Sequence, residues 1–535
     1  MAVITLGNVY STVTELTKVS LRSLRKDLCV KSPGHEHVPS FKKGFWDGNI
    51  KFYEIDEDTK ALTFPTGLLS KVAKSIKLCE EPFDIIDNRE SIEVEVPDDI
   101  ELKHSELGSI TLRDYQYDSV SVALNSSRGI INVATNGGKT EIACGIIQQI
   151  LPHIPTGKRI VFFTHSKEIF SQSKKRIEER LGMEVGAIGD GKWNERRVTV
   201  VMIPTISKYL ELPKKLPKSK KLNELKAELD AAKLAYKADK SYKSAKDKAQ
   251  ADYKAYEAEQ WEKLTESVDR TTRFLENTIG FLADEAHHSS AKTWYDLFMK
   301  LDNAYFRYGL TGTVDDSNPL NVMRLLASTG RIIKKVSNEF LIERGYSAKP
   351  TIFMLGLGDI ESITSVNYML ARREGIILSG IRNRIFANKI HERANSGKQC
   401  LIIVNETEHG EIMLDLLKGN GYTVEFTHGD KTNTFREEVL DRLKTGDLQV
   451  LIATTILDEG VDVSGINSLF LMAGGKSMRQ VLQRIGRGLR KKADGSGLEV
   501  YDSLDYHNEY LTEHTLDRVM TYKEEGFDIQ KIPAK

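Results

Sequence analysis

The chain has 535 residues, of which 40% are hydrophobic and 28% charged, a composition typical of a soluble globular protein with two to four domains. No apolar stretch approaches the roughly 18 residues of a membrane span, and the N-terminus lacks the basic start and long apolar run of a signal peptide. The 76 basic and 76 acidic residues cancel, which does not exclude nucleic acid because a neutral protein can still carry a basic groove. Four scattered cysteines without a C-x-x-C pair favour reduced thiols in a cytosol and argue against zinc.

Residues 1–105 are predicted to form a small α+β domain. The hydrophobic pattern indicates strands over 3–10 and 49–55 and helices over 16–28 and 66–78. The acidic segment 94–106 is interpreted as a linker to the next domain.

A cluster of basic and aromatic residues lies inside this first domain. Lys42 and Lys43 precede Phe45 and Trp46 beside a glycine turn. Such residues suit phosphate contact plus stacking on an unpaired base. The alternative is that the two aromatic residues are core and the two lysines a solvated turn.

A phosphate-binding loop is predicted at residues 134–140. It follows the apolar run 129–133 and precedes a helical pattern over 141–151, the strand–loop–helix context that such a loop needs. Backbone N–H groups and the helix N-terminus would hold the phosphates. Val133 stands where the usual motif has its first glycine, and Asn136 is unusual within the loop. The candidate phosphate-binding residues are Thr135, Asn136, Gly137, Gly138, Lys139 and Thr140.

An insertion rich in lysine, alanine and glutamate occupies residues 214–265. A similar apolar stripe over 242–256 follows a break near residues 240 and 241. Before the break, apolar residues recur at spacings of three and four: Leu222, Leu225, Leu229, Ala232 and Tyr236. This pattern predicts an antiparallel helical hairpin. Its charges are interpreted mainly as a solvated face, with DNA contact or strand separation as the alternative.

A pair of carboxylates, Asp284 and Glu285, ends the apolar run 279–283. Asp284 and the Thr140 hydroxyl are candidate Mg²⁺ ligands, and Glu285 can orient or deprotonate a water molecule. An Asp-Glu pair alone is commonly a solvated turn. Its position downstream of a predicted phosphate loop makes a chance occurrence of the pair unlikely.

Alternating strands and helices predict two α/β domains with parallel sheets, over 107–349 and 351–503, with sites at the carboxyl ends of the strands. The tail 504–535 is too short for its own core and is expected to pack on these domains. The expected strands are 159–163, 198–203, 280–283 and 305–310 in the first domain, and 400–404, 422–426, 449–453, 467–472 and 498–502 in the second.

Six segments in this order resemble motifs of the superfamily 2 helicases and translocases: 112–116, 134–140, 284–287, 309–313, 453–462 and 483–490. In that family they are the adenine-reading Q motif and motifs I, II, III, V and VI. The resemblance implies two tandem RecA-like motor domains that use ATP and Mg²⁺.

The resemblance also assigns roles around the nucleotide. Arg113 and Gln116 would read the adenine, because a glutamine amide offers both a donor and an acceptor. Gly460 and Asp462 would contact the nucleotide from the second domain. The residues implied to couple hydrolysis to domain motion are His287, Thr311, Gly312 and Thr313. No cysteine or further histidine lies at ligand spacing from His287 and His288, so a zinc role is poorly supported.

Arginine fingers are implied near the end of the second domain. Arg487 and Arg490 lie at i and i+3 and so share one helix face, and guanidinium groups suit a γ-phosphate. They would reach the nucleotide only when the two domains close, with Gln483 helping in that interface.

Nucleic-acid contacts are implied at the family's motifs Ia, Ib, IV and V. These positions hold mostly hydroxyl and turn residues, which fits sequence-independent phosphate binding. They are Thr164, His165, Ser166, Pro204, Thr205, Asn405, Glu406, Thr454 and Thr455.

The glycine turn at 44–48 and the helix start at 65–68 resemble the N-terminal domain of phage UvsW-type recombination helicases. With Lys42, Lys43 and Trp46 as further DNA contacts, we expect an ATP-dependent motor that remodels branched DNA as a monomer. It would act without an obligatory protein partner, in the bacterial cytoplasm if phage-encoded. The alternatives are a restriction-system translocase subunit, an RNA helicase, and an ATP-gated clamp that does not unwind.

Overall fold

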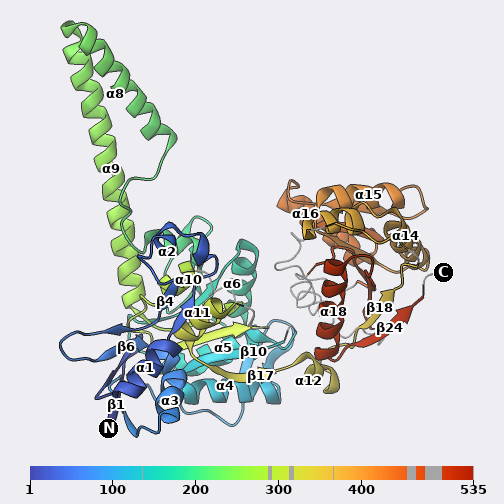
Figure 1. Cartoon of the computed structure of the whole chain (residues 1–535), viewed down its shortest axis with the longest axis horizontal. Helices are drawn as coiled ribbons and strands as arrows, with labels where there is room; N and C mark the ends of the chain where they lie inside the picture. The colour runs from blue at the N-terminus through green and yellow to red at the C-terminus, as the bar shows by residue number, and fades with distance from the viewer. Residues whose placement is uncertain are drawn as a thin grey trace.

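A computed structural model of the chain describes residues 1–134, 136–286, 292–312, 318–358, 360–365, 367–454, 466–475 and 497–533. Its three main sheets have five, eight and seven strands. Figure 1 shows the N-terminal domain and the eight-stranded sheet in one lobe and the seven-stranded sheet in the other. Among the described helices, none is long and apolar enough to cross a membrane.

The N-terminal domain is built on a sheet of order β5-β6-β2-β1-β7. The prediction of one strand over 3–10 is wrong, because the chain turns at Gly7 into an antiparallel hairpin of β1 and β2. A Cβ at Gly7 would lie 2.4 Å from the Tyr10 carbonyl oxygen. The turn was not predicted because apolar residues lie on both sides of it in the sequence. The elements are β1 (Ala2–Leu6), β2 (Tyr10–Thr14), α1 (Lys18–Asp27), β3 (Cys29–Lys31), α2 (Pro39–Lys42), β4 (Asn49–Lys51), β5 (Glu54–Ile55), β6 (Leu62–Pro65), α3 (Leu69–Leu78) and β7 (Phe83–Asp87).

The first motor domain carries a sheet of order β13-β12-β14-β11-β15-β16-β10-β17, in which only the β12–β13 pair is antiparallel. The four predicted strands are confirmed as β11, β14, β15 and β16. Its strands are β10 (Arg128–Val133), β11 (Arg159–Thr164), β12 (Gly186–Gly189), β13 (Lys192–Asn194), β14 (Val198–Met202), β15 (Thr278–Ala283), β16 (Phe306–Thr311) and β17 (Ile332–Val336). Its helices are α4 (Asp114–Ser126), α5 (Lys139–Ile150), α6 (Lys167–Leu181), α7 (Ile203–Ile206), α10 (Lys292–Phe298), α11 (Pro319–Thr329) and α12 (Asn338–Glu343).

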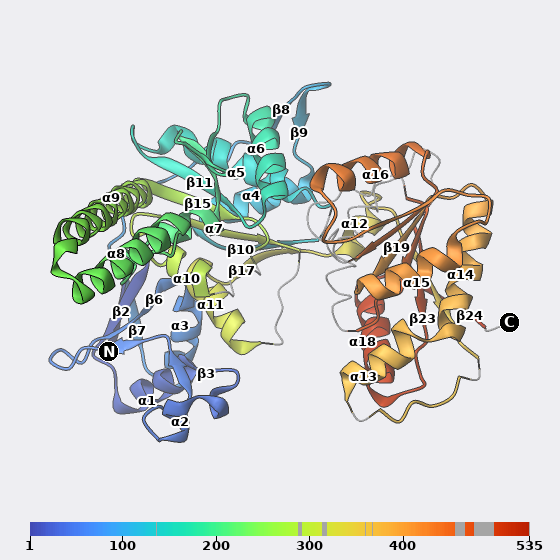
Figure 2. The same ribbon diagram turned by 90° about the horizontal axis from the view of Figure 1, so that it is seen from above.

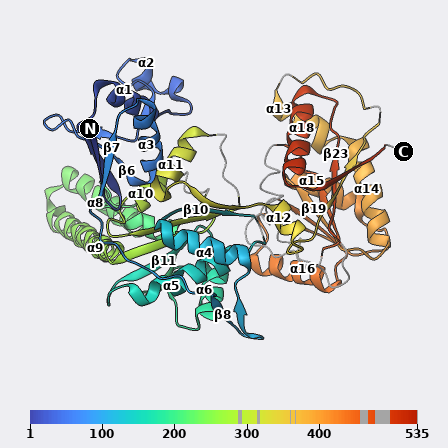
Figure 3. The same ribbon diagram turned by 90° about the horizontal axis from the view of Figure 1, so that it is seen from below.

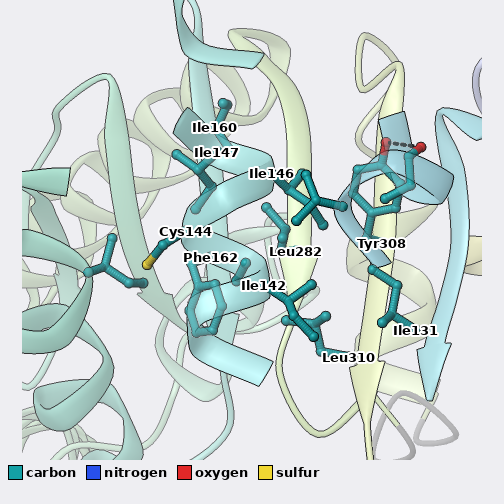
Figure 4. Close-up of a cluster of buried hydrophobic side chains, with 14 of the residues drawn as sticks. Ile131, Ile142, Cys144, Ile146, Ile147, Ile160, Phe162, Leu282, Tyr308 and Leu310 are labelled. Atoms are coloured by element: carbon teal, nitrogen blue, oxygen red, sulfur yellow. Dashed lines mark hydrogen bonds between the residues drawn. The ribbon is translucent and has the colours of Figure 1, made fainter. Parts of the chain in front are cut away.

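Helix α5 packs its apolar side on this sheet. Figure 4 shows Ile142, Ile146 and Ile147 of α5 against Phe162 and Leu310 of the strands. A parallel sheet is covered on both faces, so its strands are continuous apolar runs, which is why they were predictable. The segment 94–106 is less simple than the predicted linker, because β8 (Glu101–His104) pairs with β9 (Gly108–Thr111).

The predicted helical hairpin forms, and its second helix continues beyond the expected end at residue 265. Helix α8 (Lys220–Ala238) runs antiparallel to α9 (Lys243–Glu276), and a short 3₁₀ turn over Lys240–Tyr242 joins them. Leu225 and Leu229 are buried between the two helices. Figure 1 shows the hairpin projecting from the first lobe, and Figure 2 shows it on the same side as the N-terminal domain.

The second motor domain carries a parallel sheet of order β20-β21-β19-β22-β23-β18-β24. The expected domain limit at 503 divides this sheet, because β24 from the tail pairs with β18. The tail therefore completes the domain and does more than pack on it. The elements are β18 (Thr351–Leu355), α13 (Tyr368–Arg372), α14 (Gly380–Asn395), β19 (Cys400–Val404), α15 (Thr407–Leu417), β20 (Val424–Thr427), α16 (Asn433–Thr445), β21 (Val450–Thr454), β22 (Ser468–Leu471), β23 (Glu499–Ser503), α18 (Glu509–Glu524) and β24 (Asp528–Ile532).

A buried charge network fixes the tail helix to this sheet. Arg518 of α18 donates to Asp502 at 2.8 Å and to Asp505 at 3.2 Å, and Arg382 of α14 donates to Asp505 at 3.0 Å. Burial alone would raise the pKa of Asp505, but the two guanidinium groups outweigh it and lower that pKa. Removing one partner would leave a buried charge uncompensated, so the tail is integral to the fold.

A buried histidine makes the stability of this domain depend on pH. Burial lowers the pKa of His409 to about 3, and its Nε2 lies 3.1 Å from Asn383 Oδ1. The unfolded side chain takes up a proton below about pH 6.5, whereas the folded one stays neutral, so acid favours unfolding. We expect the domain to lose about 2 kcal/mol of stability between pH 7 and pH 5. Denaturant unfolding of the wild type and His409→Gln at both pH values measures this. Equal pH dependence in the two proteins would refute it.

The N-terminal domain shares its core with the first motor domain. Leu320, Met323 and Ala327 of α11 belong to the same buried cluster as Ile4, Phe64 and other apolar residues of the N-terminal sheet. A Cβ at Gly67 would lie 2.1 Å from the Leu326 carbonyl oxygen, so the two backbones meet closely there. Figure 3 shows α11 beside this domain. The N-terminal domain is thus packed onto the motor, not tethered to it.

Candidate nucleotide site

A pocket of about 800 Å³ opens where β10 and β15 end, at the carboxyl edge of the first motor sheet. This is the edge at which parallel α/β sheets place their ligands. The described residues that line it come from the phosphate loop, the Asp-Glu pair, the β8–β9 hairpin, the start of α4, α6 and the connection after α12. Among the sequence candidates, the lining residues are Arg113, Gln116, Asn136, Gly138, Lys139, Thr140, Asp284 and Glu285.

The phosphate loop adopts a conformation that few side chains tolerate. Asn136 and Gly138 have φ of 69° and 73°, in the left-handed region that asparagine and glycine enter most easily. A Cβ at Gly138 would also lie 2.2 Å from Gln116 Nε2. This explains the unusual asparagine: the backbone turns there, and α5 then begins at Lys139 with its N-terminus toward the pocket.

The buried Gln116 side chain braces the phosphate loop. Its Oε1 accepts from the Arg113 backbone N–H at 3.0 Å, and its Nε2 donates to the Gly137 carbonyl oxygen at 3.2 Å. Tyr115 donates to the same carbonyl oxygen at 3.0 Å. An amide has two N–H groups and two lone pairs, so one of each remains for an adenine. Gln116 thus links the position predicted to read the base to the loop predicted to hold the phosphates.

Gln116→Ala should weaken ATP binding by about tenfold, because the loop loses one hydrogen bond and the base two possible ones. Gln148→Ala is the matched control, since Gln148 lies on α5 and donates to the Glu101 carbonyl oxygen away from the pocket. Equilibrium binding of a fluorescent ATP analogue measures both. Equal affinity in the two variants would show that Gln116 has no part in the site.

An aromatic side chain near the base-reading position was not predicted. The Arg113 guanidinium lies 4.4 Å from the ring centre of Tyr346, which lines the pocket from the connection between the two motor domains. Tyr115 lies beside the same ring, with centroids 5.5 Å apart. The sequence carried no signal for Tyr346, because it is more than two hundred residues from Arg113.

The catalytic candidates meet inside the pocket. Lys139 Nζ lies 3.6 Å from Glu285 Oε1, with both side chains about 15% exposed. Asp284 follows β15, and its carboxylate accepts from the Glu285 backbone N–H at 3.0 Å. Glu285 has φ of 48°, a strained value for a residue without asparagine's or glycine's tolerance. Such strain concentrates at functional sites, and it turns this carboxylate toward the loop lysine.

The oxygen donors suit magnesium. Thr140 and Asp284 line one pocket, and Mg²⁺ takes hydroxyl, carboxylate, water and phosphate oxygens. Among the described residues, no cluster of three or more His, Cys, Asp or Glu side chains forms a metal cage. Mg²⁺ commonly binds through one or two protein ligands plus phosphates. When bound with ATP, the ion would neutralise charge on the β- and γ-phosphates.

A second charged group in the pocket was also missed. Arg176 of α6 donates through Nε to Glu141 at 2.8 Å, and Arg180 Nε lies 3.5 Å from the same carboxylate. Burial lowers the pKa of Arg176, but Glu141 outweighs it and raises that pKa overall. Glu141 is two residues after Lys139, so the pair holds α6 against the start of α5.

The coupling segment at the end of β16 contacts the phosphate-loop strand. In the amide orientation that satisfies its hydrogen bonds, Asn132 of β10 donates to the carbonyl oxygens of Gly312 at 3.1 Å and Thr311 at 3.3 Å. Strand β16 lies between β10 and β15, so the segment runs between the loop and the Asp-Glu pair. Asn132 therefore joins the strand that leads into the phosphate loop to Thr311 and Gly312.

The expected DNA-contact residues lie at the carboxyl ends of their strands, but not all face solvent. Thr164 is fully buried and its hydroxyl faces the Val201 carbonyl oxygen at 3.5 Å, which argues against a DNA contact by that side chain. Ser166 caps α6, and Asn405 donates to the Ala473 carbonyl oxygen at 3.1 Å. Thr454 is buried at the end of β21.

The remaining contact candidates on the first domain also follow strand ends: His165 follows β11, and Pro204 and Thr205 lie in α7 after β14. Glu406 of the second domain is occupied by an ion pair with Arg372 at 2.9 Å. Several predicted residues lie outside the described part of the chain: Thr135, His287, Thr313, Thr455, Gly460, Asp462, Gln483, Arg487 and Arg490.

Comparison with known proteins gives two family matches and remote relatives. Residues 109–316 match the model described as type III restriction enzyme, res subunit, and residues 382–492 match the helicase conserved C-terminal domain. Together they cover more than half of the chain.

The chain is similar to the ATP-dependent DNA helicase UvsW of Enterobacteria phage T4, at 26% identity over 46% of this chain and 52% of that protein. It therefore spans about half the length of this relative. It is also similar to the DNA 3'-5' translocase XPB2 of Sulfurisphaera tokodaii, at 24% identity over 72% of this chain and 79% of that protein. Among solved structures, a fragment of an HsdR subunit of a type I restriction enzyme from Vibrio vulnificus matches with a TM-score of 0.50 and 15% identity. That match covers 87% of this chain and 82% of the fragment, and it supports the fold alone.

Proposed function

The chain belongs to the superfamily 2 helicases, and on that basis we propose that it hydrolyses ATP to move on DNA and remodel branched DNA. The observation that carries the proposal is the meeting of Lys139, Thr140, Asp284 and Glu285 in one pocket at the sheet edge. These residues supply phosphate binding, metal binding and an oriented water, which phosphoryl transfer to water requires. The arginine fingers, Arg487 and Arg490, would complete the site on domain closure.

Exposed residues of the N-terminal domain support a branched substrate. Phe45 is 83% exposed, which argues against the alternative that it is a core residue, and Lys42 and Lys43 beside it are also exposed. Trp46 is partly buried and donates to the Asn49 carbonyl oxygen at 2.9 Å, so it would support the loop. A basic pocket of about 400 Å³ lies beside this loop; four of its lining residues are Arg25, Lys26, Lys31 and Lys51.

A restriction-system translocase is the second candidate. It is favoured by the family match over 109–316. Such a subunit would follow linear duplex and need no preference for a junction. We further propose that the chain acts as a monomer in the cytoplasm, which would be that of a bacterial host if the chain is phage-encoded.

An ATPase panel tests these possibilities. Hydrolysis is measured with forked DNA, single-stranded DNA, linear duplex and single-stranded RNA at equal phosphate concentration. Strongest stimulation by the fork, together with unwinding of it, supports branched-DNA remodelling. Strongest stimulation by linear duplex identifies a duplex translocase, and by RNA an RNA helicase. Stimulated ATP binding without unwinding of any substrate identifies a clamp.

DNA affinity should fall with salt, because the exposed Lys42 and Lys43 would neutralise phosphates, and it should depend weakly on sequence, because the other candidate contacts are mostly hydroxyl and turn residues. Each phosphate neutralised on a single strand contributes about 0.7 to the slope of log affinity against log salt. Titrations of unstructured oligonucleotides of different sequence, over a series of salt concentrations, measure both quantities. A salt-independent affinity, or a strong preference for one sequence, would contradict this expectation.

A further inference from the structure

The helical hairpin is anchored firmly at its base. Phe274 and Leu275, near the end of α9, belong to a buried cluster of the first motor domain, together with Phe281 and Phe298. At 1.5 Å per residue, the 34 residues of α9 span about 50 Å. Figure 1 shows the two helices projecting together away from the motor sheet. Any group near the far end is therefore held at a distance from the nucleotide site.

The contacts along the seam, the line where α8 and α9 pack together, determine which residues of each helix face outward. Leu225 and Leu229 are buried in it, and the Tyr236 ring lies under two ammonium groups, Lys240 at 4.2 Å and Lys246 at 4.7 Å. These contacts define one side of each helix as the seam. The side chains on the two flanks of the seam then follow from the helical repeat of 3.6 residues.

Each flank carries charges of mainly one sign. On each helix, a side chain about 90° beyond the seam in the direction of the chain points to one flank of the hairpin. Because the two helices are antiparallel, this flank is the same for both. On that side lie five exposed lysines, which we name the lysine flank: Lys226, Lys233 and Lys237 of α8 and Lys243 and Lys254 of α9. The other side, the acidic flank, carries four exposed carboxylates: Glu224 and Glu228 of α8 and Asp252 and Glu259 of α9.

The separation of positive and negative side chains between the two flanks is incomplete. Three carboxylates, Asp230, Asp247 and the half-buried Glu257, lie toward the lysine flank, where Asp230 pairs with Lys233 at 3.7 Å. Three lysines, Lys221, Lys248 and Lys263, lie toward the acidic flank, where Lys263 pairs with Glu259. The lysine flank keeps a net positive charge and the acidic flank a net negative one. A merely solvated hairpin needs no such division.

We propose that the lysine flank binds the phosphate backbone of a duplex DNA arm while the motor holds the rest of the substrate. The inference rests on the proposed function and names the element that holds the duplex. Duplex DNA carries one charge per about 1.7 Å, so a row of lysines meets phosphates in any sequence. The arm of about 50 Å exceeds one helical turn of about 34 Å, which suits an extended rod better than a flexible single strand. The acidic flank repels the same polyanion and so fixes the orientation.

The test compares two variants of the full-length protein. The lysine-flank variant changes its five lysines to glutamine, and the acidic-flank variant carries Glu224→Gln, Glu228→Gln, Asp252→Asn and Glu259→Gln. Binding to a labelled blunt duplex of about three helical turns is measured by fluorescence anisotropy over a series of salt concentrations. Far-UV circular dichroism and thermal melting establish that both hairpins remain helical.

The lysine-flank variant should bind the duplex at least about tenfold more weakly at low salt, with a salt slope smaller by about 2 to 4. The acidic-flank variant should bind as tightly as the wild type or more tightly. If a lysine-flank variant that remains helical keeps the duplex affinity and salt slope of the wild type, the inference is overturned. An acidic protein surface would then be the candidate partner of this flank. ATPase stimulation of the wild type by DNA is measured in parallel. If that stimulation is absent, the proposed function fails; if it is present and only the duplex result is negative, the inference alone fails.

Discussion

Replacing Glu285 with glutamine is expected to lower ATP turnover by about 10³-fold while leaving ATP affinity nearly unchanged. Glutamine has the same shape, so the pocket lining is preserved, but it cannot take up a proton from water. Lys139, which lies 3.6 Å from Glu285, loses an ion-pair partner and remains available to phosphate. The effect should therefore fall on kcat and not on binding.

Glu211→Gln is the matched control for this change. Glu211 is an exposed carboxylate that pairs with Lys300 at 3.0 Å, outside the nucleotide pocket. DNA-stimulated phosphate release gives the turnover, and binding of a non-hydrolysable analogue gives the affinity. Near-normal turnover in Glu285→Gln would move the catalytic role to another residue. A parallel loss of affinity would instead assign Glu285 to nucleotide binding.

The elements that could be predicted are those identified by a pattern within a short stretch of the sequence. Strands β11, β14, β15 and β16 are apolar runs because both faces of the sheet are covered, and the phosphate loop is contiguous in sequence. The edge strand β24 was missed, because its sequence from Asp528 to Ile532 is mostly polar and only its pairing with β18 makes it a strand. Glycine at position 7 likewise marks a turn only once β1 and β2 are paired.

The residues of the candidate site likewise divide into those identified by a local sequence motif and those that reach the site only through the fold. Lys139, Asp284 and Glu285 were identified from short motifs, and the pocket brings them together. Tyr346, Arg176 and Arg180 were missed because they meet the site through tertiary contacts with residues far away in the sequence. Gln116 was correctly placed at the pocket, but the sequence did not reveal that its amide also braces Gly137. A motif identifies a residue type and a position, whereas hydrogen-bond partners depend on the packed loop.

Changing three exposed residues of the N-terminal loop should impair fork unwinding by about tenfold or more. Stacking of one base on an aromatic ring is worth about 1–3 kcal/mol, so Phe45→Ala with Lys42→Gln and Lys43→Gln removes a stacking platform and two phosphate contacts. Deletion of residues 1–105 is a poorer test. It would uncover Leu320, Met323 and Ala327, which share the N-terminal core, and loss of activity would then reflect misfolding of the motor.

The matched control carries Lys71→Gln and Lys74→Gln, two exposed lysines of α3 outside the loop and the basic pocket. It loses the same charge on the same domain. Fork unwinding and the ratio of fork-stimulated to single-strand-stimulated ATPase are compared between the two variants. A selective fall of both quantities in the loop variant places junction recognition on this surface, because the Lys71 and Lys74 changes remove equal charge without removing the stacking ring. Equal fork unwinding in the two variants would mean that the N-terminal loop does not select the junction and that its exposed phenylalanine has another use.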